Sequence, residues 1–193
     1  KPKLNLKTVP VYRGLNHHSH KVNSSGNCNL AFVIKLKYQP MKLFKSSIDV
    51  ISKLDQYYPN SDLSYIYKIN REKLVKIINT FESIQTTNQI TIDDWDIIEK
   101  GLHENWYEIY FTHVGEYLAL LEPEHPEISK RLLALMASKK YIIRRNIVDI
   151  CMLFINKTLS RAILKIGIQD KSSRVFEIAF YIISTKYIND TEL

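Results

Sequence analysis

The stretch ISKRLLALMASKKYIIRRNIVDICMLF, residues 128–154, is followed by a second stretch that reads much like it, LSRAILKIGIQDKSSRVFEIAFYII, residues 159–183. Each contains two segments in which apolar residues recur every three or four positions, the period of an amphipathic helix. A short polar turn separates the two segments. Because one helix pair cannot bury its apolar face alone, the repetition predicts two antiparallel helix pairs stacked side by side, over residues 127–157 and 158–187.

This pattern resembles the HEAT and HEAT-like helical repeats, in which an Asp in the turn and an Arg at the start of the second helix recur. Asp170 and Arg174 match that pattern. The preceding repeat has the matching Arg144 but carries Ser138 and Lys139 where the Asp would stand, and neither first helix contains the proline often found there. The resemblance covers about 60 residues and implies a mainly α fold of stacked antiparallel helix pairs with an extended binding surface.

Composition and hydropathy place the chain among ordinary globular proteins. Its 193 residues are 45% hydrophobic and 24% charged, and no apolar run approaches the roughly 18 residues of a membrane span. The chain begins without a signal-like apolar segment, so we expect a soluble cytoplasmic protein that contacts no membrane. The two cysteines, Cys28 and Cys151, fit incidental thiols better than a disulfide framework.

The first 45 residues differ in kind from the rest. Residues 3–12 and 30–38 alternate apolar with polar side chains as strands do, and residues 13–27 between them are rich in Gly, Ser and Asn. We therefore expect a basic β-hairpin-like segment over residues 1–45 and a helical repeat domain over residues 46–193.

Helical signals begin directly after this segment. The stretch SSIDVISKLDQYY predicts a helix with Ile48, Val50 or Ile51, and Leu54 on its buried side, and Asn70 is a candidate N-cap of the next helix. Thr91 and Asp94 have the spacing of a capping box. Residues 105–121 predict one long helix, which the proline-containing EPEHPE ends.

Charge is distributed by segment. Residues 1–48 have nine basic side chains and no acid, residues 49–127 have six basic and fifteen acidic side chains, and residues 128–187 have twelve basic and three acidic ones. Such segregation predicts local fields of both signs, which steer binding partners. The same charges could instead be solvated faces that neutralise one another within the fold.

No catalytic signature stands out. The group His17, His18 and His20 could bind zinc or copper, but it lies in a loop of Asn and Ser that provides neither fixed geometry nor a fourth ligand. Cys28 beside these histidines lacks an acid, because the first acidic residue along the chain is Asp49. There is no Gly-rich phosphate loop. We therefore predict no enzymatic activity, no cofactor and no metal.

Protein binding is the function that the sequence favours. An acidic block interspersed with aromatic residues has the composition of interface hot spots, and its members are Glu104, Trp106, Tyr107, Glu108, Tyr110, Glu116, Glu122 and Glu124. In size and charge segregation the chain resembles small HEAT-like immunity proteins of bacterial contact-dependent toxin systems. That resemblance implies a cognate toxin as partner, such as a nuclease, whose basic surface the acidic block would cover.

The alternative is nucleic-acid binding through a basic repeat surface. Repeats place equivalent positions in register, so basic side chains in the two repeats can line one surface. The candidates are Lys139, Lys140, Arg144, Arg145, Lys171 and Arg174. HEAT-like alkylpurine DNA glycosylases use a basic concave surface in this way, and a resemblance to them would imply a DNA ligand.

Overall fold

A computed structural model describes residues 46–193 of the chain. This part is mainly α-helical, as predicted, and it contains eight α-helices and no strand. None of these helices combines the length and the apolar character needed to cross a membrane. The hairpin expected over residues 1–45, and with it His17, His18, His20 and Cys28, lies outside the described residues.

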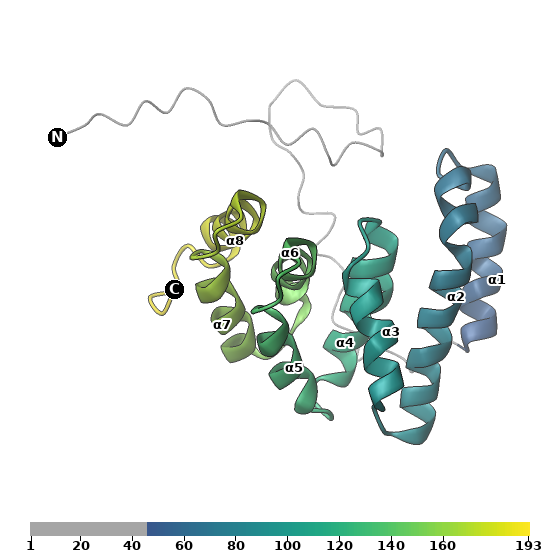
Figure 1. The fold of residues 1–193 in the computed structure, drawn as a ribbon, viewed down its shortest axis with the longest axis horizontal. Coiled ribbons are helices and arrows are strands. Elements are labelled where there is room, and N and C mark those ends of the chain that lie inside the picture. The colour runs from purple at the N-terminus through teal and green to yellow at the C-terminus, as the bar shows by residue number, and fades with distance from the viewer. Residues whose placement is uncertain (1–45) are drawn as a thin grey trace. The chain divides into compact units, whose positions relative to one another are not determined.

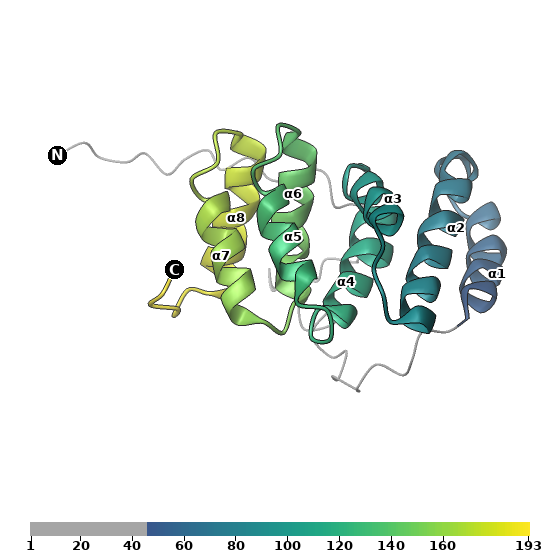
Figure 2. The ribbon, with the colours of Figure 1, turned by 60° about the horizontal axis from the view of Figure 1, so that its bottom comes forward.

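Consecutive helices lie beside one another in pairs (Figures 1 and 2). The first members of the pairs are α1 (Ser47–Tyr57), α3 (Ile92–Leu102), α5 (Glu127–Leu135) and α7 (Lys157–Gly167). The second members are α2 (Ser64–Thr87), the π-helical segment η3 (Glu108–Gly115) continued by α4 (Glu116–Leu121), α6 (Tyr141–Ile150) and α8 (Ser173–Lys186). Short 3-10 turns are η2 (Tyr58–Asn60) and η4 (Cys151–Leu153). The second members contact each other in sequence, α2 with η3, η3 with α6, and α6 with α8.

Several helix boundaries lie where the sequence predicts them. The Thr91 hydroxyl accepts the backbone N–H of Asp94 while the Asp94 carboxylate accepts the Thr91 N–H, which confirms the capping box at the start of α3. Helix α4 ends at Leu121 and α5 begins at Glu127, so EPEHPE ends the helix as expected. The helices α5 to α8 occupy the two predicted pairs.

Two predictions near the start of the helical part are wrong. Ile48, expected on the buried side of its helix, is 73% exposed, whereas Val50, Ile51 and Leu54 pack against the core as predicted. Asn70 does not cap a helix, because α2 begins at Ser64. Asn70 lies within α2, away from its ends, and its buried side chain donates a hydrogen bond to the carbonyl of Ile66, 3.0 Å away.

Residues 105–121 do not form the single α-helix that was predicted. They form η3, a two-turn π-helical segment, and then α4. Hydrogen bonds from residue i to residue i+5 widen the helix, and such segments are rare and frequent at functional sites. Ile109, Val114 and Leu118 of this segment are fully buried.

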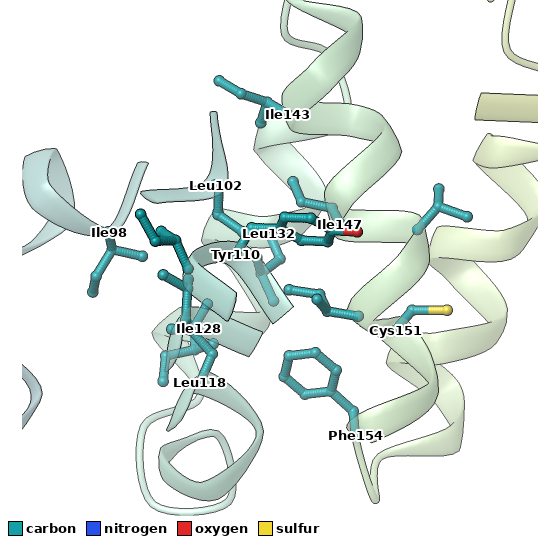
Figure 3. Close-up of a cluster of buried hydrophobic side chains, with 14 of the residues drawn as sticks. Ile98, Leu102, Tyr110, Leu118, Ile128, Leu132, Ile143, Ile147, Cys151 and Phe154 are labelled. Carbon is teal, nitrogen blue, oxygen red and sulfur yellow. The ribbon is translucent and has the colours of Figure 1, made fainter. Parts of the chain in front are cut away.

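One hydrophobic cluster joins the pairs (Figure 3). Ile98 and Leu102 come from α3, and Ile128 and Leu132 come from α5. The other labelled members of the cluster are Tyr110, Leu118, Ile143, Ile147, Cys151 and Phe154. The pairs therefore share a continuous core, as a stacked arrangement requires.

Candidate functional site

The acidic block predicted to bind a partner is divided by the fold. Glu122 is only 6% exposed and accepts hydrogen bonds from the Ser129 hydroxyl, at 2.5 Å, and from the Asn156 amide, at 2.9 Å. These bonds tie the end of α4 to α5 and to the start of α7. Glu122 is therefore held inside the molecule, and its prediction as a binding residue is wrong.

Three further members of the block make contacts of other kinds. Glu104 forms an ion pair with Lys73, with 2.8 Å between Oε1 and Nζ. Trp106 is half-buried and packs edge-on against the rings of Tyr58 and Tyr67. Glu124 is exposed in the turn between α4 and α5.

The remaining four residues gather around η3. Tyr107 stands at its start and stacks on Phe111, with ring centroids 4.5 Å apart. In π-helical geometry, residues four or five positions apart lie on the same face. Tyr107, Phe111 and Glu116 therefore share one face of this segment. Glu108 also belongs to this first turn, with a side chain that is 22% exposed.

Helix α6 supplies two side chains to the same place. The Tyr110 hydroxyl donates a hydrogen bond to Oδ2 of Asp149, at 2.8 Å, and the Arg145 guanidinium lies 5.5 Å from the centre of the Tyr110 ring. Asp149 was not predicted as a binding residue. The signal that could have found it is the i, i+4 spacing from Arg145, which puts both side chains on one face of α6. We call Tyr107, Glu108, Phe111, Glu116 and Asp149 the η3 cluster.

Two carboxylates of the η3 cluster, those of Asp149 and Glu116, have pKa values raised by burial. Burial raises the pKa of Asp149, against the opposing effects of the Tyr110 hydroxyl and of Arg145. Burial also raises the pKa of Glu116, the nearby His113 opposes that rise, and Glu108 adds to it. Neither carboxylate forms an ion pair with another described residue. The site therefore contains two desolvated acids, because burial outweighs the opposing effects of Arg145 on Asp149 and of His113 on Glu116.

His113 lies behind this cluster and is 4% exposed. Its Nε2 is 3.4 Å from Oε1 of Glu108, too poorly aligned for a hydrogen bond, and within the described chain neither ring nitrogen has a hydrogen-bond partner. Burial opposes ionisation of Glu108, but the contacts with His113 and Tyr58 outweigh it and lower its pKa. Glu108 is thus the one acid of the cluster that the protein itself stabilises in its charged form.

The residues predicted to form a basic surface differ in their exposure. Arg144 is buried, with only 5% of its side chain exposed, and its guanidinium binds both carboxylate oxygens of Asp170, at 2.6 and 2.9 Å. Its prediction as a surface residue is wrong. Lys139, Lys140 and Lys171 are exposed in the turns that precede α6 and α8. Arg145 and Arg174 each lie over a tyrosine ring.

Within residues 46–193, no group of three or more His, Cys, Asp or Glu side chains is arranged to hold a metal ion. Comparison of the chain with family models, with curated proteins and with solved structures finds no match. The geometry of the η3 cluster and of the neighbouring basic turns is therefore the basis for a functional interpretation.

Proposed function

We propose that this chain is a HEAT-like repeat scaffold that binds another protein through the η3 cluster and performs no catalysis. The observation that carries the proposal is the set of half-buried acids beside the exposed Tyr107. Buried carboxylates without a cation reduce stability, so a chain retains them where a partner supplies the missing charge. Tyrosine beside charge is also a common composition of interface hot spots.

The HEAT-like part of the proposal is supported by the Arg144–Asp170 ion pair. Asp170 lies in the turn of the last helix pair, and Arg144 lies near the start of the second helix of the preceding pair. The Asp and Arg positions that suggested the resemblance thus connect one pair to the next. A connection of this kind stabilises a stack through interfaces between nearest neighbours.

We further propose that the scaffold acts as a bacterial immunity protein that neutralises a toxin in the cytoplasm. The acids of the η3 cluster require a basic counterpart, and a toxin that acts on nucleic acid has a basic surface. Covering that surface would block the toxin sterically and electrostatically.

Nucleic-acid binding is the second candidate, and one observation favours it. Lys139, Lys140 and Lys171 are exposed in neighbouring turns that the Arg144–Asp170 pair holds together. Phosphate contacts by these three lysines would give binding that weakens steeply as salt concentration rises. Charge reversal of all three should abolish such binding and leave a complex at the η3 cluster unchanged.

A pull-down from the extract of the source cells, with and without nuclease treatment, tests the two candidates. A stoichiometric protein that remains after nuclease treatment, and that is lost with Tyr107→Leu, supports protein binding. The matched control is Glu124→Gln, which changes an exposed acid away from the η3 cluster. Recovery of nucleic acid alone, released by raised salt, would reject the first candidate in favour of the second.

A further inference from the structure

Arginine already lies on tyrosine at two places along the second helices. Arg145 covers the ring of Tyr110 at 5.5 Å, beside the carboxylate of Asp149. Arg174 covers the ring of Tyr141 at 5.5 Å, and its Nη1 donates to the Tyr141 hydroxyl at 2.6 Å. Guanidinium groups favour such positions because they are planar, weakly hydrated and attracted by the ring quadrupole.

Tyr107 is a neighbour of Tyr110, and no cation of the described chain lies over its ring. Its ring is edge-on to Tyr110, with 5.7 Å between centroids, and the residue is 46% exposed. Burial raises the pKa of Tyr107, and the nearby charges of Asp149, Glu116 and Glu108 raise it further. An accessible aromatic ring therefore lies within the field of three carboxylates.

His113 is an independent sign that the cluster is incomplete. It is buried against Glu108, and neither of its ring nitrogens has a hydrogen-bond partner within residues 46–193. An unsatisfied buried polar group reduces stability and calls for an explanation. A guanidinium that enters beside Glu116 would supply positive charge and N–H donors to its carboxylate.

We propose that the η3 cluster binds one arginine side chain of the partner protein, with its guanidinium against the Tyr107 ring and between the carboxylates of Glu116 and Asp149. This inference rests on the proposed protein-binding function and specifies the chemistry of the partner. A guanidinium fits better than an ammonium, because it stacks on the ring while its N–H groups reach carboxylates at its edge.

The first test uses the full chain and a short peptide, acetyl-Gly-Arg-Gly-amide. NMR spectra of the chain with isotope-labelled tyrosine follow the ring signals of Tyr107 during titration. The expected result is a saturable shift of Tyr107 that the isosteric citrulline peptide fails to produce at the same concentrations. An equal response to citrulline, or an arginine response that leaves Tyr107 unchanged, would overturn the inference.

Substitutions then identify the groups that bind the peptide. Glu116→Gln keeps the shape of the side chain and removes its charge, and Tyr107→Leu keeps apolar bulk and removes the ring. Each should weaken peptide binding by about tenfold, the factor that corresponds to one strong charge-assisted contact. Glu124→Gln should leave it unchanged. Circular dichroism checks that each variant is folded, and folded variants that bind as tightly as the wild type would contradict the proposal.

The outcomes separate this inference from the proposed function. A partner protein that is captured equally well by the wild type and by Glu116→Gln would leave protein binding intact and reject the arginine site. Specific binding of the arginine peptide, without any protein recovered from the extract, would retain the site and reject the proposed function.

Discussion

Two groups of charged residues lie against helix α6, and they differ in how their charges are balanced. The pair Arg144–Asp170 is buried, and each charge has its partner, with an additional hydrogen bond from Arg144 to the carbonyl of Ser138 at 2.5 Å. In the η3 cluster, Glu116 and Asp149 are half-buried and form no ion pair within the described chain. Within the described residues the charges of the first group are paired, whereas in the second group burial outweighs the effects of the neighbouring Arg145 and His113.

The contrast indicates different roles for the two groups. A satisfied buried pair specifies how two helix pairs meet, because any other arrangement would leave a charge unpaired. Desolvated acids that lack a partner reduce stability, which is a common property of binding sites. Substitutions in the two groups should therefore have opposite effects on folding.

The largest effect is expected from Arg144→Met. Removal of the guanidinium leaves the Asp170 carboxylate buried without its partner, which costs roughly 3–5 kcal/mol of stability. Urea unfolding followed by circular dichroism measures the loss. Arg174→Met is the matched control, because Arg174 is exposed and donates a hydrogen bond to the hydroxyl of Tyr141.

A second substitution sharpens the interpretation of Arg144→Met. Adding Asp170→Asn to the Met variant removes the stranded charge and should recover part of the lost stability. If Arg144→Met unfolds at the same urea concentration as the wild type, the pair does not hold the two helix pairs together.

The second-largest loss of stability is expected at the contact between η3 and the end of α6. A Cβ at Gly115 would lie 2.6 Å from Cγ2 and 3.0 Å from Cβ of Ile150, and a β-branched side chain cannot move these atoms away. Gly115→Ala should therefore lose about 1–3 kcal/mol, the usual cost of overpacking, in the same urea experiment. In combination with Ile150→Ala the loss should be smaller than the sum of the two single losses, and strict additivity would count against the clash.

Sequence patterns predicted those parts of the fold that depend on neighbouring residues. The capping box of Thr91 and Asp94 is local, and the burial of Ile128 and Leu159 follows from helical periodicity within each repeat. The early start of α2 was missed because its N-cap residue, Leu63, forms no side-chain capping hydrogen bond, so the first two turns carry no terminal signal. The π-helical form of η3 was missed for a similar reason, since apolar spacing hardly distinguishes it from an α-helix over two turns.

The candidate site was predicted only in part, because it depends on contacts between distant segments. Tyr107 and Glu116 are close along the chain and were identified together. Asp149 reaches the same cluster through its bond to Tyr110, across 39 positions, and Arg144 becomes buried through Asp170, across 26 positions. No local sequence pattern predicts which charged residues form such contacts between distant segments.

A smaller and opposite effect is expected from Glu116→Gln at neutral pH. The neutral amide needs no solvation of a charge, so the variant should have a slightly higher midpoint of thermal unfolding than the wild type. The same variant should bind the partner more weakly, which a purely structural residue would not show. Scanning calorimetry measures the midpoint, with Glu124→Gln as the exposed control that should not change it. A lower midpoint for Glu116→Gln would mean that the carboxylate supports the fold.

The pH dependence of these variants should sharpen the contrast further. Arg144 lowers the pKa of Asp170 below its ordinary value of 3.8, so the carboxylate stabilises the protein above that pH and loses this effect as pH falls through the lowered pKa. Burial raises the pKa of Glu116 above 4.5. Its ionisation therefore does not reduce the stability of the protein below pH 4.5, and it destabilises the protein as pH rises through the raised pKa. Relative to the wild type, Asp170→Asn should become less stable and Glu116→Gln more stable as pH increases from 3 to about 7. Unfolding midpoints across this range check both signs, and parallel curves for the two variants would show that the two groups of charges do not differ in the way their contacts indicate.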